Sequence, residues 1–233
     1  RIDAATRIPA VRGTSTREKR RHAADALDAL MSEAAVRSRG RHTLFEGLLQ
    51  AADTFGRTHR IIEDVRGKCE TYGELLRATL AFLRLGCKLA SRDEIVGVMM
   101  PNLSTTVAAL IGLGAGRRVP AMLNYTAGPE ALRSACVATK IKTVITSRKF
   151  VEAARLYPVL DALCEQRILF VEDLKQQFGL RDKMWLVLWA RWRPRSVAEQ
   201  TDPAATAVVL FTSGRSEEHT SELQSLRHLV CRL

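Results

Sequence analysis

The chain has 233 residues, of which 46% are hydrophobic, 26% charged and 6% aromatic, and it carries a formal net charge of +11. This composition is ordinary for a globular protein of one or two domains, and it excludes collagen-like, disordered and disulfide-scaffold proteins. The longest apolar runs fall short of the roughly 20 residues that a membrane-spanning helix needs. The first residues do not resemble a secretory signal and do not include Met, so we expect a piece of a longer protein.

About half of the excess positive charge lies near the N-terminus. Residues 1–41 hold ten Lys or Arg against five Asp or Glu, and the densest part of the cluster is formed by Arg12, Arg17, Lys19, Arg20 and Arg21. Such a cluster is a solvated linker, or it binds an anionic lipid surface or a nucleic acid. Because no aromatic side chains alternate with these cations, we expect no nucleic-acid partner.

Cysteine and histidine give no sign of a metal or disulfide framework. The five Cys and the five His show neither a Cys-x-x-Cys pair nor the spacing of metal ligands. We therefore expect no metal site within the chain. Five thiols without a pairing pattern are typical of a reducing cytoplasm.

In chain order, the periodicity predicts a helix over residues 21–36, preceded by Ser15 or Thr16 as its cap, and a globular region starting near His42. That region opens with a helix over 43–55 and a hairpin formed by residues 60–64 and 70–72. Beyond the hairpin, the expected strands are 94–100, 119–123, 142–146, 167–171 and 205–211. The expected helices are 72–90, 104–114, 128–138 and 150–164, of which the last is interrupted near Pro158, and a helical and then irregular stretch follows over 172–200.

This alternation of strands and helices predicts the α/β class, with a parallel sheet flanked by helices. Ligands of such sheets bind at the carboxyl ends of the strands, where Asn124 and the run Thr212, Ser213 and Gly214 are expected. Hydroxyl groups and a glycine turn suit a phosphate. Ordinary turns use the same residue types, so a plain turn is the alternative.

Several segments resemble a known family. Phe211 to Gly214, following a buried strand and the segment 118–128, resembles the adenylate-forming superfamily of acyl-CoA synthetases and their relatives. More narrowly, segments of the chain resemble the bifunctional acyl-[acyl-carrier-protein] synthetase/2-acylglycerophosphoethanolamine acyltransferase branch, at residues 43–46, 62–64, 72–78, 96–102, 118–128 and 143–150.

The resemblance implies that residues 42–214 are the N-terminal portion of an AMP-binding domain, and that 1–41 are the linker or tail of a preceding acyltransferase domain. It further implies a ligase that joins a fatty acid to ATP with Mg²⁺ and passes the acyl group to acyl carrier protein or coenzyme A. In this family a lysophospholipid is reacylated by the other half, which implies peripheral membrane contact at the cytoplasmic face of a bacterial inner membrane. Thr212, Ser213 and Gly214 are the implied phosphate-binding residues.

The chain departs from the family pattern after Gly214. The expected lysine of the phosphate loop is missing, and Glu217 and Glu218 would repel a triphosphate. Residues 215–225 resemble the translation of a sequencing adapter, so we expect 215–233 to be an artefactual tail and the chain alone to be inactive, with no catalytic residue assigned. The rival hypotheses are a fragment of a long-chain fatty acyl-CoA ligase and a non-enzymatic basic module that binds nucleic acid or membranes.

The sequence leaves two interpretations of one aromatic stripe. Trp185, Trp189 and Trp192 recur at helical spacing beside several arginines. They form either a packing face or an interfacial stripe that touches lipid.

Overall fold

The computed structural model describes residues 15–38, 41–63, 67, 69–174, 178–200 and 202–211. The chain divides into two compact units, Arg1–Arg41 and His42–Leu233. In the first unit, α1 (Thr16–Ser38) begins where the predicted cap Ser15 places its start. The reason is a reciprocal cap in which the Ser15 hydroxyl accepts from the Glu18 amide at 3.2 Å and the Ser15 amide donates to the Glu18 carboxylate at 3.3 Å.

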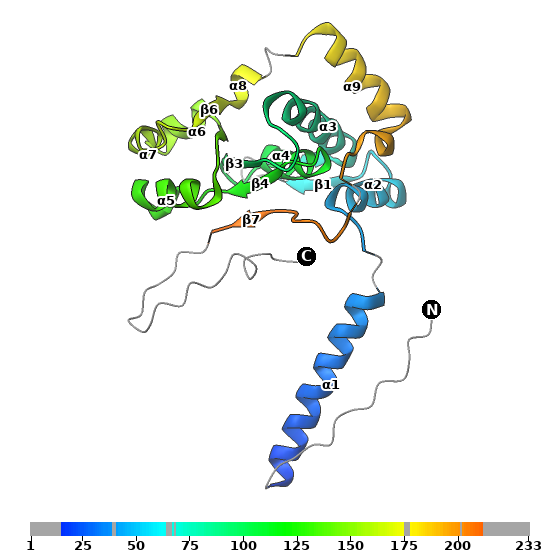
Figure 1. Cartoon of the computed structure of the whole chain (residues 1–233). Coiled ribbons are helices and arrows are strands. Elements are labelled where there is room, and N and C mark those ends of the chain that lie inside the picture. Colours follow the sequence, from blue (N-terminus) through cyan, green and yellow to red (C-terminus); the bar gives the residue numbers. More distant parts are fainter. Residues whose placement is uncertain are drawn as a thin grey trace. The chain divides into compact units, whose positions relative to one another are not determined.

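The second unit contains a hairpin, a series of strands and the helices that surround them (Figure 1). Its elements are α2 (Leu44–Phe55), β1 (Arg60–Glu63), β2 (Cys69–Thr71), α3 (Tyr72–Leu89), β3 (Ile95–Met99), α4 (Ser104–Ala115), β4 (Val119–Met122), η1 (Tyr125–Ala127), α5 (Pro129–Thr139), β5 (Thr143–Thr146), α6 (Arg148–Ala153), α7 (Tyr157–Ala162), β6 (Arg167–Phe170), α8 (Val171–Leu174), α9 (Leu180–Trp192), η3 (Pro194–Val197) and β7 (Val209–Leu210).

Local capping signals set where the first helices of this unit begin. Thr43 and Glu46 form a capping box at the start of α2, and Thr71 and Glu74 form a second one at the start of α3. Each box satisfies two backbone amides that have no partner within the helix. The helix expected from residue 43 and the hairpin before α3 are confirmed, with β1 and β2 paired antiparallel.

The remaining strands form one parallel sheet in the order β6-β5-β3-β4-β7. This confirms the predicted α/β class. The fifth strand is shorter than expected, since only Val209 and Leu210 pair with β4. The interruption expected near Pro158 in the helix over 150–164 is confirmed. The segment is divided into α6 and α7, because Arg155 has a left-handed φ of 52° and Pro158 lies in the first turn of α7.

Alternate residues of the strands pack into two separate cores, one on each face of the sheet. Val96 and Val98 of β3 point into a core built with α2, α3 and α4, and Trp185 of α9 packs at its margin. Met99 belongs to the other core, which α5, α6 and α7 cover. The unit is therefore a three-layer α/β structure with both faces of the sheet buried.

Candidate functional site

The carboxyl ends of the five parallel strands lie at one edge of the sheet. In the strand order, β3 is followed along the chain by its neighbour β4, which lies away from β5. In contrast, β5 is followed by its neighbour β6, which lies away from β3. The topological switch point therefore lies between β3 and β5, where the Thr146 hydroxyl donates to the Met99 carbonyl at 2.7 Å. Open α/β sheets bind their ligands outside this edge, which makes it the candidate site.

Asn124 follows β4 at this edge, and its side chain stabilises the turn that comes next. The Asn124 Oδ1 atom accepts hydrogen bonds from the Thr126 amide at 3.1 Å and from the Thr126 hydroxyl at 2.7 Å. It thereby caps η1. Asn124 shapes the turn that leaves the sheet, and part of its hydrogen-bonding capacity is already used there.

The predicted phosphate-binding residues Thr212, Ser213 and Gly214 lie outside the described residues. The strand that precedes them is described. In β7, Val209 pairs with Ala121 and Leu210 with Met122, so β7 and β4 end in register at the same edge. Phe211, the last described residue before the run, packs at the margin of the core that α5, α6 and α7 cover.

A second polar cluster at this edge was missed by sequence reasoning. The Ser147 hydroxyl donates to Glu172 at 2.7 Å, and the Arg148 amide donates to the same carboxylate at 3.1 Å. Burial raises the pKa of Glu172, but these hydrogen bonds outweigh it and hold the pKa below its ordinary value. Arg148 also pairs with Asp173 and lies 4.3 Å from the ring centre of Phe170.

The cluster joins the ends of β5 and β6 and keeps a carboxylate ionised beside the candidate site. A sequence signal for it did exist, because Ser147 directly follows a predicted strand and Glu172 lies just beyond the next one. Nothing local shows that these two positions meet, since they are 25 residues apart.

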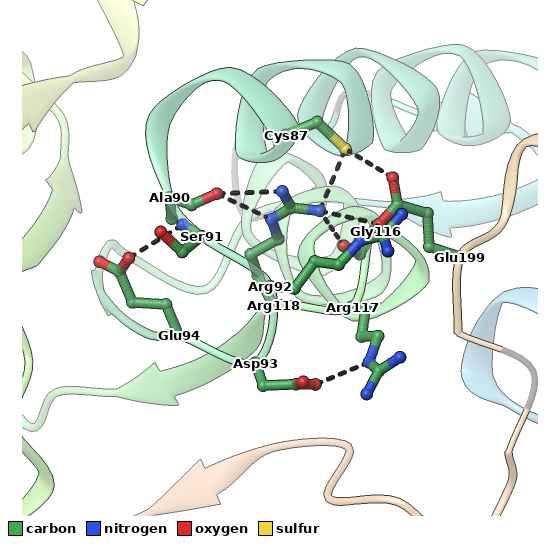
Figure 2. A network of polar contacts seen from close by, with 10 residues as sticks. All are labelled: Cys87, Ala90, Ser91, Arg92, Asp93, Glu94, Gly116, Arg117, Arg118 and Glu199. Atoms are coloured by element: carbon green, nitrogen blue, oxygen red, sulfur yellow. Dashed lines mark hydrogen bonds and ion pairs between the residues drawn. The ribbon is translucent and has the colours of Figure 1, made fainter.

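At the opposite edge of the sheet, a buried arginine organises a polar network (Figure 2). The Arg118 guanidinium donates to the Ala90 carbonyl at 3.1 and 3.0 Å, to the Gly116 carbonyl, and to the Cys87 sulfur at 3.2 Å. It forms an ion pair with Glu199 at 3.3 Å. Burial raises the pKa of the Cys87 thiol, an effect that the Arg118 charge partly offsets.

This network fixes the segment that returns to the sheet before β7. The amides of Glu199 and Gln200 donate to the Ala115 carbonyl at 2.8 and 3.1 Å, at the end of α4. Arg92 adds an exposed ion pair to Glu199 at 3.0 Å. The network thus fixes Glu199 and Gln200 against the end of α4, in the segment that precedes β7.

The described residues add two negative findings. No group of three or more His, Cys, Asp or Glu side chains within them is placed to hold a metal ion. None of the described helices is long and apolar enough to cross a bilayer.

No protein-family model matches the chain. Among solved structures, VinN in complex with 3-methylaspartate is 26% identical with a TM-score of 0.58, over 75% of this chain and 45% of that one. The anthranilate CoA ligase AuaEII in complex with anthranoyl-AMP is 12% identical with a TM-score of 0.54, over 76% of this chain and 33% of that one. O-succinylbenzoate coenzyme A synthetase (MenE) from Bacillus subtilis, in complex with AMP, is 16% identical with a TM-score of 0.52, over 72% of this chain and 39% of that one.

The second unit has the N-terminal part of the adenylate-forming synthetase fold. This confirms the fold expected from the resemblance. The chain spans less than half the length of these structural neighbours. Within this fold, the carboxyl edge of the sheet and the exit of β7 are the parts of the candidate site that the chain contains.

Proposed function

We propose that the chain is the N-terminal portion of an ATP-dependent acyl-activating ligase. The carboxylate of a fatty acid attacks the α-phosphate of ATP, which forms acyl-adenylate and releases pyrophosphate. A thiol then attacks the acyl carbonyl and releases AMP. The observation that carries this proposal is the parallel sheet order with β7 in register beside β4, combined with the likeness to adenylate-forming structures.

The finer assignments rest on the family resemblance. We infer that the thiol belongs to acyl carrier protein and that a preceding acyltransferase domain, ending in residues 1–41, passes the acyl group to a lysophospholipid at a membrane surface. Coenzyme A as the acceptor is the alternative. Residues 42–214 are the adenylation portion in this proposal, and residues 215–233 are an artefactual tail.

Thr212, Ser213 and Gly214 are the proposed phosphate-binding residues. Two hydroxyl donors and a glycine turn suit the charged oxygens of a triphosphate. Mg²⁺ would offset the charge of the phosphates, but the described residues include no set of ligands for it. Because the chain lacks the expected loop lysine after Gly214, we propose that it does not turn over alone.

The test is a pyrophosphate-release assay on this chain and on the product of the intact gene, with ATP, Mg²⁺ and a long-chain fatty acid. We expect turnover only with the intact protein, and acyl transfer to acyl carrier protein in preference to coenzyme A. Replacing Ser213 by Ala in the intact protein should lower kcat by about a hundredfold, the usual effect of removing one such donor.

Three outcomes would contradict the proposal in distinct ways. Turnover by the chain alone would refute its inactivity. Pyrophosphate release with L-aspartate but not with fatty acids would support the ligase assignment and contradict the assignment of a fatty acid as the substrate. L-aspartate is chosen because VinN was solved in complex with it. An intact gene without a lysine-bearing glycine turn after Gly214 would remove the ligase assignment itself.

A further inference from the structure

Helix α9 is apolar on two sides, and among the described residues only one of these sides packs against the rest of the chain. Trp185 and Leu186 pack against the core on the side of α3. Asp182 is buried at the same side, where Arg84 contacts it at 3.1 Å and Lys88 at 2.5 Å. These contacts orient the helix with respect to α3, beside which it lies in Figure 1.

The outer side of α9 exposes large apolar side chains at helical spacing. The exposed fractions are 76% for Leu180, 56% for Met184, 67% for Val187, 54% for Leu188 and 74% for Trp192. These five residues are called the outer face here. Met184, Val187 and Leu188, with Lys183, also line a shallow surface hollow. Contiguous apolar patches of this kind mark interaction surfaces.

The charges around the outer face have one sign. Arg181, Lys183 and Arg193 are exposed, and Asp182, the only acidic residue of α9, is turned inward onto Arg84 and Lys88. Those two ion partners hold the pKa of Asp182 below its ordinary value, so its carboxylate stays ionised and paired with Arg84 and Lys88. The solvent side of α9 therefore combines apolar residues with cations.

We propose that the outer face of α9 lies on an anionic lipid surface, with Trp192 at the level of the headgroups. An apolar stripe flanked by Lys and Arg is the pattern of helices that bind in the plane of a membrane interface. Trp is favoured at that interface because its ring is apolar and its N–H is polar. Anionic headgroups complement the flanking cations.

A second copy of the chain fits this surface less well. A symmetric contact through the outer face would bring the cations of two copies together, and like charges across an interface are unfavourable. The inference rests on the exposure of α9 in this chain and uses no step of the proposed ligase reaction.

The test compares two matched variants of the full chain, Val187→Asp and Val137→Asp. Val137 is a control because it is 62% exposed, similar to Val187, but lies on α5 against the other face of the sheet. Binding is measured by sedimentation with phosphatidylcholine vesicles, with and without phosphatidylglycerol. Circular dichroism checks that both variants keep the fold.

We expect Val187→Asp to weaken binding to the anionic vesicles by about tenfold or more. Val137→Asp should change binding less than about twofold, since that side chain faces no lipid. Brominated lipids should quench tryptophan fluorescence, and Trp192→Phe should remove most of the quenching.

If Val187→Asp and Val137→Asp change vesicle binding equally, the proposal is overturned, and the binding is assigned to other basic regions, such as residues 1–41. Equal binding to vesicles without phosphatidylglycerol would refute the anionic selectivity. A lipid-free dimer that Val187→Asp dissociates would show that the outer face is a self-association surface instead.

Discussion

Gly112 of α4 lies directly against the backbone of α3. A Cβ atom at this position would lie 2.4 Å from the Thr79 carbonyl oxygen and 2.8 Å from the Phe82 Cβ atom, both on α3. The run of glycines near the end of α4 therefore has a packing function in addition to ending the helix. Only a residue without a side chain allows α3 and α4 to approach this closely.

Replacing Gly112 by Ala should lower the free energy of unfolding by about 1–3 kcal/mol, because the backbone of α3 must move away. Gly114→Ala is the matched control in the same helix, since a Cβ atom there meets nothing within 4 Å. That change should be neutral or stabilising by up to about 1 kcal/mol, because Ala favours helix. Urea denaturation of both variants checks the difference, and equal effects would show that the contact is not limiting.

At the scale of elements, the segment between α9 and β7 depends on one buried arginine. Arg118 has 6% of its side chain exposed, whereas its neighbour Arg117 has 46% exposed and pairs with Asp93 at 2.8 Å. The two residues are adjacent in sequence and have the same charge. They differ in burial and in the number of backbone carbonyls that they satisfy.

Arg118→Met should lower the free energy of unfolding by at least about 2 kcal/mol, since the half-buried carbonyl of Ala90 and the buried carbonyl of Gly116 lose their donor. Arg117→Met should cost less than about 1 kcal/mol, the usual range of an exposed ion pair. Thermal and urea denaturation of the two variants measures this contrast. A similar loss in both would mean that the network in Figure 2 contributes no more than surface charge.

For the whole molecule, the sheet order places β3 between β5 and β4, with a core on each of its faces. The two outermost strands of the sheet are β6 and the short β7. Stability in such a structure is highest where strands are paired on both sides and buried on both faces, and lowest at edges.

Native-state hydrogen exchange should therefore be slowest at the amides of β3 and β5, including Val98 and Ile145, which are 0% and 1% exposed. Val209 and Leu210 should exchange much faster, because β7 pairs on one side only and over two residues. Mass spectrometry of exchanged peptides measures both. Protection of β7 equal to that of β3 would contradict the sheet order as the source of stability.

The element pattern of the second unit, its α/β class and the edge of the sheet that carries the candidate site could be predicted from the chain. The capping boxes at Thr43 and Thr71 and the buried Val- and Ile-rich strands are signals that act within a few residues. The division between α6 and α7 was also predicted near Pro158, although its exact position depends on one left-handed residue, Arg155. The short length of β7 could not be predicted, since it depends on pairing with β4.

Contacts between distant residues were decided only in three dimensions. Ser147 meets Glu172, and Arg118 meets Glu199 from 81 residues away. Asp182 turns toward α3, whereas Arg181 and Lys183 are exposed. The three tryptophans of the predicted stripe do not share one environment, because Trp185 packs against the core while Trp192 is exposed. Periodicity and caps specify local structure through nearest neighbours along the chain, whereas strand order and long-range ion pairs depend on which packed arrangement buries the two cores best.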